Sequence, residues 1–107
     1  MLILNEMSEA LASSKEPLIK QIYEKAGKKL LAIGLRRGVE LPEHIAQEKA
    51  KLMVVQGEID FNTATHSYRL ERFDSFDIPK DIKHSVVGVF DAVFLLLLGD
   101  SKELTVF

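Results

Sequence analysis

Residues 57–71 read GEIDFNTATHSYRLE, and this stretch decides the fold. Polar and apolar residues alternate over residues 58–61 and alternate again over residues 67–71. A period of two is that of a β-strand with one buried face. The turn-forming residues 62–65 lie between the two runs, so the sequence predicts that the runs pair as a β-hairpin.

Further short strands are predicted on the C-terminal side of this hairpin. Residues 76–78 stop at Pro79, a residue suited to the end of a strand. Residues 86–90 and 92–98 are strongly apolar, and the second run stops at Gly99. Short strands at this spacing, separated by turns, predict an antiparallel sandwich or barrel.

The N-terminal half has a helical character that competes with this prediction. Apolar residues recur at three- and four-residue steps over residues 16–31, and residues 42–56 begin with a proline and continue with good helix formers. Because the second half reads as strands, we interpret the first half as strands over residues 18–24 and 30–36, with Gly27 supplying a positive φ in the turn between them. The alternative is an α+β domain with two N-terminal helices.

The length of 107 residues fits one domain. We expect a loose arm or a short helix over residues 1–15, a β-barrel domain over residues 16–100 and a tail over residues 101–107. The chain has no cysteine, which excludes disulfides and thiolate metal sites and suits a cytoplasmic protein.

Composition also argues against two classes of partner. Basic residues are scattered along the chain and the formal net charge is −2, whereas nucleic-acid-binding proteins concentrate cations on one face. The most apolar stretch, residues 85–98, is interrupted by Gly88 and Asp91 and is shorter than the ~20 residues that span a bilayer. We therefore expect neither nucleic-acid binding nor membrane insertion.

Two motifs in the chain resemble those of the cupin family. The first cupin motif has a glycine, a His-x-His pair, a glutamate and a second glycine, and here Gly38, His44 and Gly57 follow that pattern. The second motif has Pro-x-Gly followed by a histidine, and here Pro79 and His84 match it.

The resemblance covers residues 35–98, with Phe73 and Asp81 at positions where the family often has glycine. It implies a small, single-domain, RmlC-like cupin. Such a chain is all-β and folds as a double-stranded β-helix, also called a jelly-roll barrel. Its two antiparallel sheets enclose a pocket for a ligand or a metal.

Part of the metal site that the resemblance implies is missing. Metal-binding cupins use two histidines and a glutamate from the first motif and a histidine from the second, and these positions are His44, Ala46, Ala50 and His84 here. Alanine offers no lone pair, so we expect no tightly bound cofactor. The alternative is a divalent transition metal held by His44 and His84 and completed by water or by Glu48.

The resemblance places His44 and His84 at the pocket, and two further polar residues are candidates for it. Glu48 has the same strand parity as His44, and Gln56 follows in the next predicted strand. We predict that the barrel binds a small molecule with little or no metal-dependent catalysis. The alternatives are a metal-dependent dioxygenase or isomerase with a rebuilt metal shell, and a structural dimerisation module. The sequence predicts neither a substrate nor a catalytic residue.

A homodimer is expected as well, because related small cupins often pair. The predicted strand over residues 18–24 is the candidate interface, since an unpaired edge strand invites pairing with another chain.

Overall fold

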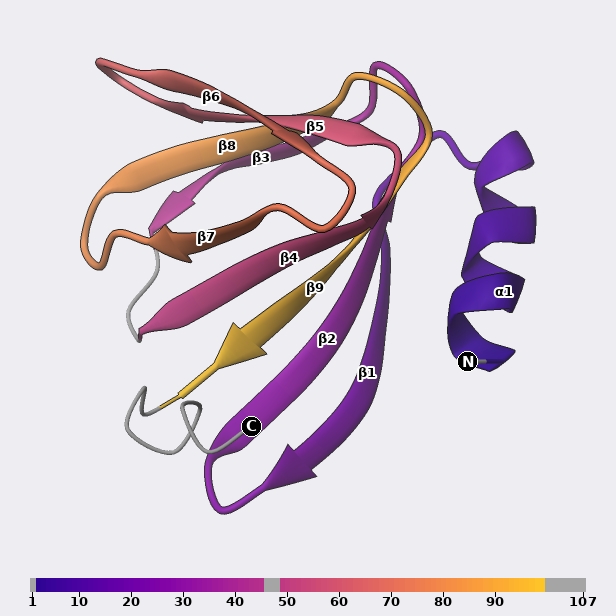
Figure 1. Ribbon diagram of the computed structural model, residues 1–107, viewed down its shortest axis with the longest axis horizontal. Helices are drawn as coiled ribbons and strands as arrows, with labels where there is room; N and C mark the ends of the chain where they lie inside the picture. The colour runs from indigo at the N-terminus through magenta and orange to yellow at the C-terminus, as the bar shows by residue number, and fades with distance from the viewer. Residues whose placement is uncertain (1, 46–48, 100–107) are drawn as a thin grey trace.

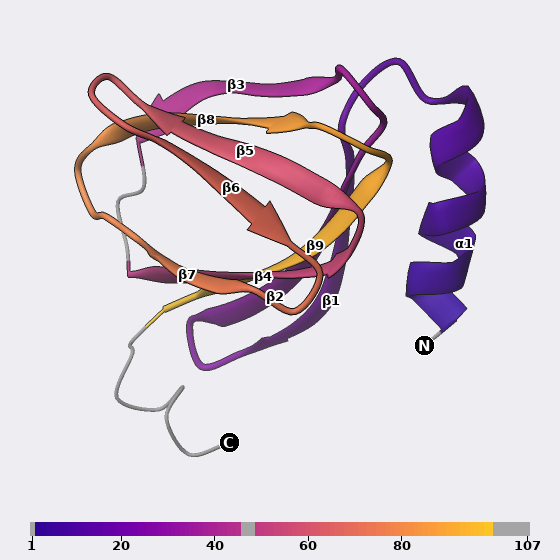
Figure 2. The same cartoon turned by 45° about the horizontal axis from the view of Figure 1, so that its top comes forward.

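The structure is a computed structural model that describes residues 2–45 and 49–99, and it consists of two antiparallel β-sheets that pack face to face (Figures 1 and 2). The five-stranded sheet has the order β1-β2-β9-β4-β7, and the four-stranded sheet has the order β3-β8-β5-β6. The expected all-β, antiparallel architecture is confirmed. The elements are α1 (Leu2–Ala10), the 3₁₀ helix η1 (Leu11–Ser13), β1 (Leu18–Lys25), β2 (Lys28–Leu35), β3 (Glu40–Ile45), β4 (Ala50–Gln56), β5 (Glu58–Thr63), β6 (Ser67–Glu71), β7 (Ser75–Ile78), β8 (Lys83–Gly88) and β9 (Ala92–Leu98).

The predicted hairpin forms from β5 and β6, and its alternation matches the two faces of the sheet. Ile59 lies opposite Leu70, and both side chains are buried between the sheets. On the outer face, the Arg69 Nε donates a hydrogen bond to Asp60 Oδ1 at 2.6 Å. This hydrogen bond raises the pKa of the Arg69 guanidinium. Burial on one face and charge pairing on the other therefore fix the same register.

Both segments with helical character are strands, so the alternative with two N-terminal helices is wrong. The first segment forms β1 and β2, and the second contributes to β3 and β4. Ala26 and Gly27 connect β1 to β2 with φ angles of +52° and +79°, the conformation of a type I′ hairpin turn. In β2 and β9, some apolar residues pack between the two sheets and others pack under α1 on the outer face. Both faces of these strands are therefore apolar, and their sequences lack a clean period of two.

The N-terminal residues form α1 and η1, which pack on the outer face of the five-stranded sheet (Figure 1). Met7 and Leu11 are buried there against Ala32 and Val93. Gly34 makes room for the contact, because a Cβ at this position would lie 3.0 Å from Leu11 Cδ2. Neither helix of the described residues is long and apolar enough to cross a membrane.

The two positions at which cupins often have glycine have the backbone conformation that glycine favours. Phe73 has a φ of +73° and Asp81 a φ of +63°. Left-handed conformations bring the Cβ of an L-residue close to the following carbonyl oxygen. The chain therefore keeps the turn geometry of these positions without the residue that suits it best.

Phe73→Gly is expected to raise the free energy of unfolding by about 0.5–1 kcal/mol. The left-handed conformation costs about 1–2 kcal/mol, and the greater freedom of glycine in the unfolded chain offsets part of the gain. Phe73 is 68% exposed, so little burial is lost with its ring. Urea denaturation measures the change.

Phe90→Gly is the matched control for this substitution. Phe90 is 52% exposed and lies beneath the Arg37 guanidinium, much as Phe73 lies beneath Arg72, but its φ is not positive. This control should therefore lose stability. If both variants lose stability equally, the left-handed conformation of Phe73 is not the reason for the predicted gain.

Candidate functional site

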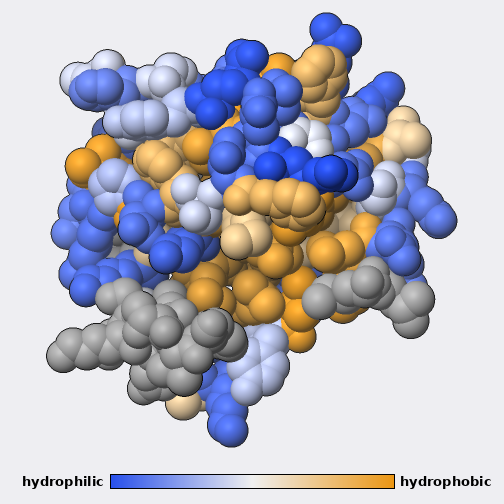
Figure 3. Space-filling model, viewed as in Figure 1, coloured by the Kyte–Doolittle hydropathy of each residue, from blue (hydrophilic) through white to orange (hydrophobic). Residues whose placement is uncertain are grey.

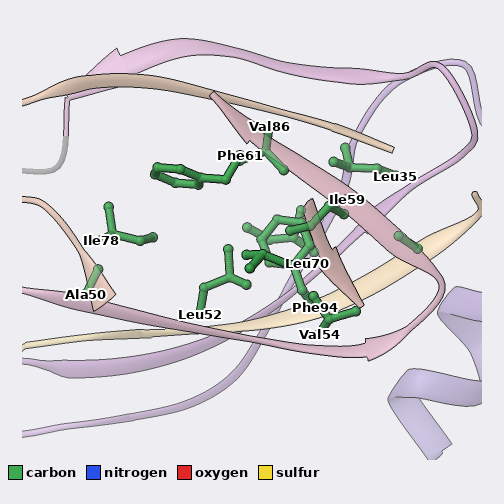
Figure 4. Close-up of a cluster of buried hydrophobic side chains, with 12 residues drawn as sticks. Leu35, Ala50, Leu52, Val54, Ile59, Phe61, Leu70, Ile78, Val86 and Phe94 are labelled. Atoms are coloured by element: carbon green, nitrogen blue, oxygen red, sulfur yellow. The ribbon is translucent and has the colours of Figure 1, made fainter. Parts of the chain in front are cut away.

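The interior between the two sheets is almost wholly apolar. Figure 4 shows side chains from both sheets pointing into it, with Leu35 toward one end and Ala50 and Ile78 toward the other. The buried cluster consists of Ile33, Leu35, Ala50, Leu52, Val54, Ile59, Phe61, Leu70, Ile78, Val86, Ala92 and Phe94. Among residues 3–42 and 49–99, whose burial the structure describes, the only buried polar side chain is that of His84, which is 3% exposed.

His84 is positioned by β8, in which alternate residues are buried. Its Nδ1 lies 3.1 Å from the carbonyl oxygen of Ile82. Because a carbonyl oxygen only accepts, Nδ1 carries the proton, and in the neutral ring Nε2 carries the lone pair. The imidazole also stacks on Phe61, with ring centroids 4.9 Å apart and an interplanar angle of 20°. The ring is thus oriented by a hydrogen bond on one edge and by an aromatic face.

The backbone brings the two predicted histidines to neighbouring positions. In the antiparallel pair of β3 and β8, His44 is the direct register partner of His84. Residues directly opposite each other in such a pair have Cα atoms about 4.5–5.5 Å apart. Thr63, at the end of β5, is the register partner of His84 on the other side.

These positions define one end of the barrel, here called the mouth. It comprises the tip of the β5–β6 hairpin, the end of β7 and the start of β8, which Figure 2 shows together at one end of the two sheets. Ala50, at the start of β4, is the register partner of Ile78 at the end of β7, so it also lies at the mouth. Its side chain is buried in the apolar cluster.

Two other predicted pocket residues do not join His84 in the described structure. Gln56 is six residues from Ala50 along β4, roughly 20 Å for an extended strand. A register shift between Val54 and Gln56 makes Gln56 the partner of Val93, which packs on the outer face of the sheet. Gln56 therefore lies at the opposite end of the barrel from the mouth. Glu48 lies outside the described residues.

The end of the barrel opposite the mouth is tightly closed. Gly57 links β4 to β5 there with a φ of +70°, and a Cβ on it would lie 2.2 Å from the backbone oxygen of Asp91. The Asp91 carboxylate accepts a hydrogen bond from the backbone N–H of Arg37 at 2.9 Å. Asp91 thus joins two turns of the chain at the closed end.

Sequence reasoning missed a row of contacting rings at the mouth, two of the contacts stacked and two tilted. The rings are in contact in the order His66, Tyr68, Phe76, Phe61 and His84. Successive centroids are 5.9, 5.0, 4.8 and 4.9 Å apart. Tyr68 is two residues from the buried Leu70 in β6, so the period of two could have indicated that Tyr68 faces inward.

The described donors do not make a metal centre. Among the described residues, no group of three or more histidine, cysteine, aspartate or glutamate residues could hold a metal ion. Ala50 occupies the position of the cupin glutamate and lies among hydrophobic side chains. His44 and His84 as metal ligands therefore stay a prediction.

An open groove of about 570 Å³ lies on the outside of the barrel. It runs between the start of β1 and the start of β3, and it contains none of the predicted pocket residues. It is lined by Lys15, Glu16, Pro17, Ile19, Gly38, Val39, Glu40, Leu41 and Pro42.

Comparison with known proteins identifies the fold. No protein-family model matches the chain, and no curated protein matches it in sequence. An RmlC-like cupin from Desulfovibrio desulfuricans is 21% identical, with a TM-score of 0.71 over 78% of this chain and 82% of that one. A cupin superfamily protein from Desulfitobacterium hafniense is 15% identical, with a TM-score of 0.72 over 77% of this chain and 75% of that one. A cupin-2 domain containing protein from Shewanella frigidimarina is 12% identical, with a TM-score of 0.72 over 91% and 92% of the two chains.

The chain therefore has the fold of the small RmlC-like cupins, an antiparallel jelly roll, as its two motifs predicted. At these identities the likeness concerns the fold alone. Function depends on the residues placed on a fold, so it has to be argued from His84 and its surroundings.

Proposed function

We propose that this chain binds a small molecule at the mouth of its barrel, in contact with His84, with little or no metal-dependent catalysis. The observation that carries the proposal is the placement of the His84 imidazole, 3% exposed, in an interior whose other described buried side chains are hydrophobic. Pockets for small molecules are mostly apolar, with a few polar groups that fix the orientation of the ligand. His84 has the character of such a polar group.

The chemistry of His84 indicates what the ligand should carry. Its Nδ1 donates a hydrogen bond to the carbonyl oxygen of Ile82 at 3.1 Å, which orients the imidazole. An imidazole nitrogen with a lone pair accepts a hydrogen bond from a hydroxyl or an N–H group. An apolar ligand with one hydroxyl would therefore match both the aliphatic surroundings and the histidine.

One observation favours a metal-dependent enzyme as the second candidate. His44 and His84 are direct register partners, and two imidazoles at neighbouring positions suit a divalent transition metal. Ala50 argues against this candidate, because the position supplies no carboxylate. Any metal would need ligands from water or from residues 46–48.

A homodimer also stays a prediction. β1 is an edge strand, and its Ile19 and Tyr23 are each 55% exposed. Figure 3 shows hydrophobic surface over β9 and β2, beside α1. However, a register shift between Gln21 and Tyr23 and the charge of Lys20 are features that oppose strand addition at an edge.

The ligand proposal is tested by titrating the protein with two bicyclic alcohols, 2-naphthol and trans-2-decalol, in a calorimeter. An alcohol of this size that fits the site should bind with a Kd of roughly 0.1–1 mM. His84→Leu places an apolar side chain at this position and removes the imidazole, so the tighter-binding alcohol should bind about tenfold more weakly.

Ser85→Ala is the matched control, because Ser85 follows His84 in β8 and lies on the other face of the strand. It should leave the Kd unchanged. If His84→Leu lowers the melting temperature sharply, His84→Gln provides a polar replacement for the same comparison. Binding of neither alcohol, or equal binding to the parent and both His84 variants, would contradict the proposal.

A further inference from the structure

We propose that the outer face of the five-stranded sheet binds an acidic amphipathic helix of another protein, on the part that the described residues leave uncovered. On this face α1 lies beside β1 and β2 and covers the part toward the closed end of the barrel (Figure 1). The inference does not rest on the proposed ligand site, which is at the mouth. Its basis is an apolar strip across four strands that lysines border.

The register of the strands places this apolar strip, called the outer strip below, next to α1. Tyr23, Leu30 and Leu97 are successive cross-strand partners in β1, β2 and β9. Leu95, two residues before Leu97, is the partner of Met53 in β4. The two partners at the ends are the most exposed, Tyr23 at 55% and Met53 at 40%. Because neighbouring strands lie about 4.8 Å apart, the outer strip spans about 14 Å, the length of a helix of roughly 9–10 residues.

The helices at the N-terminus show how a helix packs on this face. Met7 and Leu11, four residues apart, are buried against the sheet, and Leu95 of the outer strip packs against the same cluster. The outer strip is therefore continuous with an interface that already holds a helix. The charged residues of α1 are the exposed acids Glu6 and Glu9, so the helix that this face holds is itself acidic.

Lysines border the outer strip on both sides. Lys20 and Lys25 belong to β1, and their register partners place them on the face of the outer strip. On the β4 side, Lys51 is the partner of Leu97, and its Nζ lies 3.6 Å from Asp77 Oδ1 in an exposed ion pair. Such a pair contributes little, so a carboxylate of a partner can replace Asp77 at small cost. A cationic border around an apolar strip is complementary to a helix with leucines on one face and glutamates beside them.

The lysines also argue against a second copy of this chain as the occupant. A two-fold dimer brings the same patch of both copies together, so the two cationic borders would meet. Like charges placed opposite each other destabilise a complex, whereas an acidic helix brings opposite charges to the same lysines.

The test titrates the protein with two synthetic peptides of about 14 residues, a length at which an isolated helix begins to form. Both peptides have leucines at three- and four-residue steps. One has glutamate and alanine at its other positions, and its twin has lysine in place of every glutamate. The acidic peptide should bind with a Kd of roughly 0.1 mM and its twin at least about tenfold more weakly. Fluorescence anisotropy of labelled peptides measures both.

Charge reversal at the border tests where the peptide binds. Lys20→Glu together with Lys25→Glu should weaken binding of the acidic peptide about tenfold, because it replaces two attractions by repulsions. Lys80→Glu together with Lys83→Glu is the matched control. It changes the net charge equally, but at the turn before β8 and at the start of that strand, so it should leave the Kd unchanged.

The apolar part of the outer strip is tested by Met53→Ser, which should weaken binding about fivefold through lost apolar contact. Met53 is 40% exposed, so the substitution leaves the core in place. Phe90→Ser is the control, since Phe90 is 52% exposed in the turn between β8 and β9 at the closed end. It should leave the Kd unchanged.

Equal binding of the two peptides, or an acidic-peptide Kd that is the same in the Lys20/Lys25 and Met53 variants as in the parent, would overturn the proposal. Lysine-dependent binding to vesicles of phosphatidylcholine and phosphatidylserine, without binding of the acidic peptide, would overturn it in favour of a membrane surface. Binding of the acidic peptide that appears only after residues 101–107 are removed would also overturn it, because the chain's own C-terminal segment would then be the occupant.

Discussion

Gly57→Ala is expected to lower the free energy of unfolding by about 2–5 kcal/mol. The added Cβ would lie 2.2 Å from the backbone oxygen of Asp91 and 3.0 Å from the Cα of Ala92. Because these atoms are backbone atoms, no side-chain rotation relieves the overlap, and the chain at the closed end of the barrel must move. The φ of +70° adds a further cost of about 1–2 kcal/mol for any residue with a Cβ.

Gly27→Ala separates these two causes. Gly27 has a φ of +79°, but nothing lies within 4 Å of the position that its Cβ would occupy. The free energy of unfolding of Gly27→Ala should therefore fall only by the cost of the left-handed conformation, about 1–2 kcal/mol. Urea denaturation of both variants gives the comparison. If Gly57→Ala lowers the free energy of unfolding by no more than Gly27→Ala does, the predicted steric overlap at the closed end does not exist.

The second large effect is expected from restoring the missing cupin ligands. A variant with Ala46→His and Ala50→Glu should bind a divalent transition metal on the order of 100-fold more tightly than the parent. The estimate is conservative, since even the loss of a residue that merely supports a ligand changes metal affinity by about 10–100-fold. Calorimetric titration with Zn²⁺ or Mn²⁺ measures the change.

The stability of this double variant provides a second readout. Ala50 is buried among hydrophobic residues, so a carboxylate at this position without a metal should destabilise the fold. Added metal should then raise the melting temperature by more than it does in the parent. Ala50→Glu alone is the control and should be destabilised with a smaller rescue. Equal metal affinity in parent and double variant would show that His44 and His84 are not placed as cupin ligands.

Much of the fold could be predicted because local pattern and long-range pairing agree. In residues 57–71 the alternation, the turn and the buried face all predict the β5–β6 hairpin that forms. Over β2 the local pattern and the long-range pairing disagree: apolar residues occur on both faces of the strand, because α1 covers one face and the barrel interior covers the other. Its interpretation as a strand therefore depended on the strands predicted in the second half of the chain. The packing of Leu11 over Gly34 had no signal in the sequence.

The candidate site was predicted less completely, and the reasons are specific. Motif spacing pointed to His44 and His84, and the structure places them as register partners across β3 and β8. It could not foresee the shift near the end of β4 that places Gln56 at the closed end. The contact between Tyr68 and Phe76 depends on two edge strands from different sheets meeting at the mouth, a tertiary feature that no single strand pattern contains.

The claim that this barrel binds a small molecule through His84 without a metal is tested most directly by one titration. The protein is dialysed against a mild chelator, its metal content is measured, and the same sample is titrated with 2-naphthol in a calorimeter. The predicted result is well under one metal ion per chain together with a Kd that stays within twofold of that before dialysis. Retention of about one metal ion per chain, or binding that disappears on dialysis and returns when Zn²⁺ or Mn²⁺ is added, would contradict the claim and favour a metal-dependent enzyme.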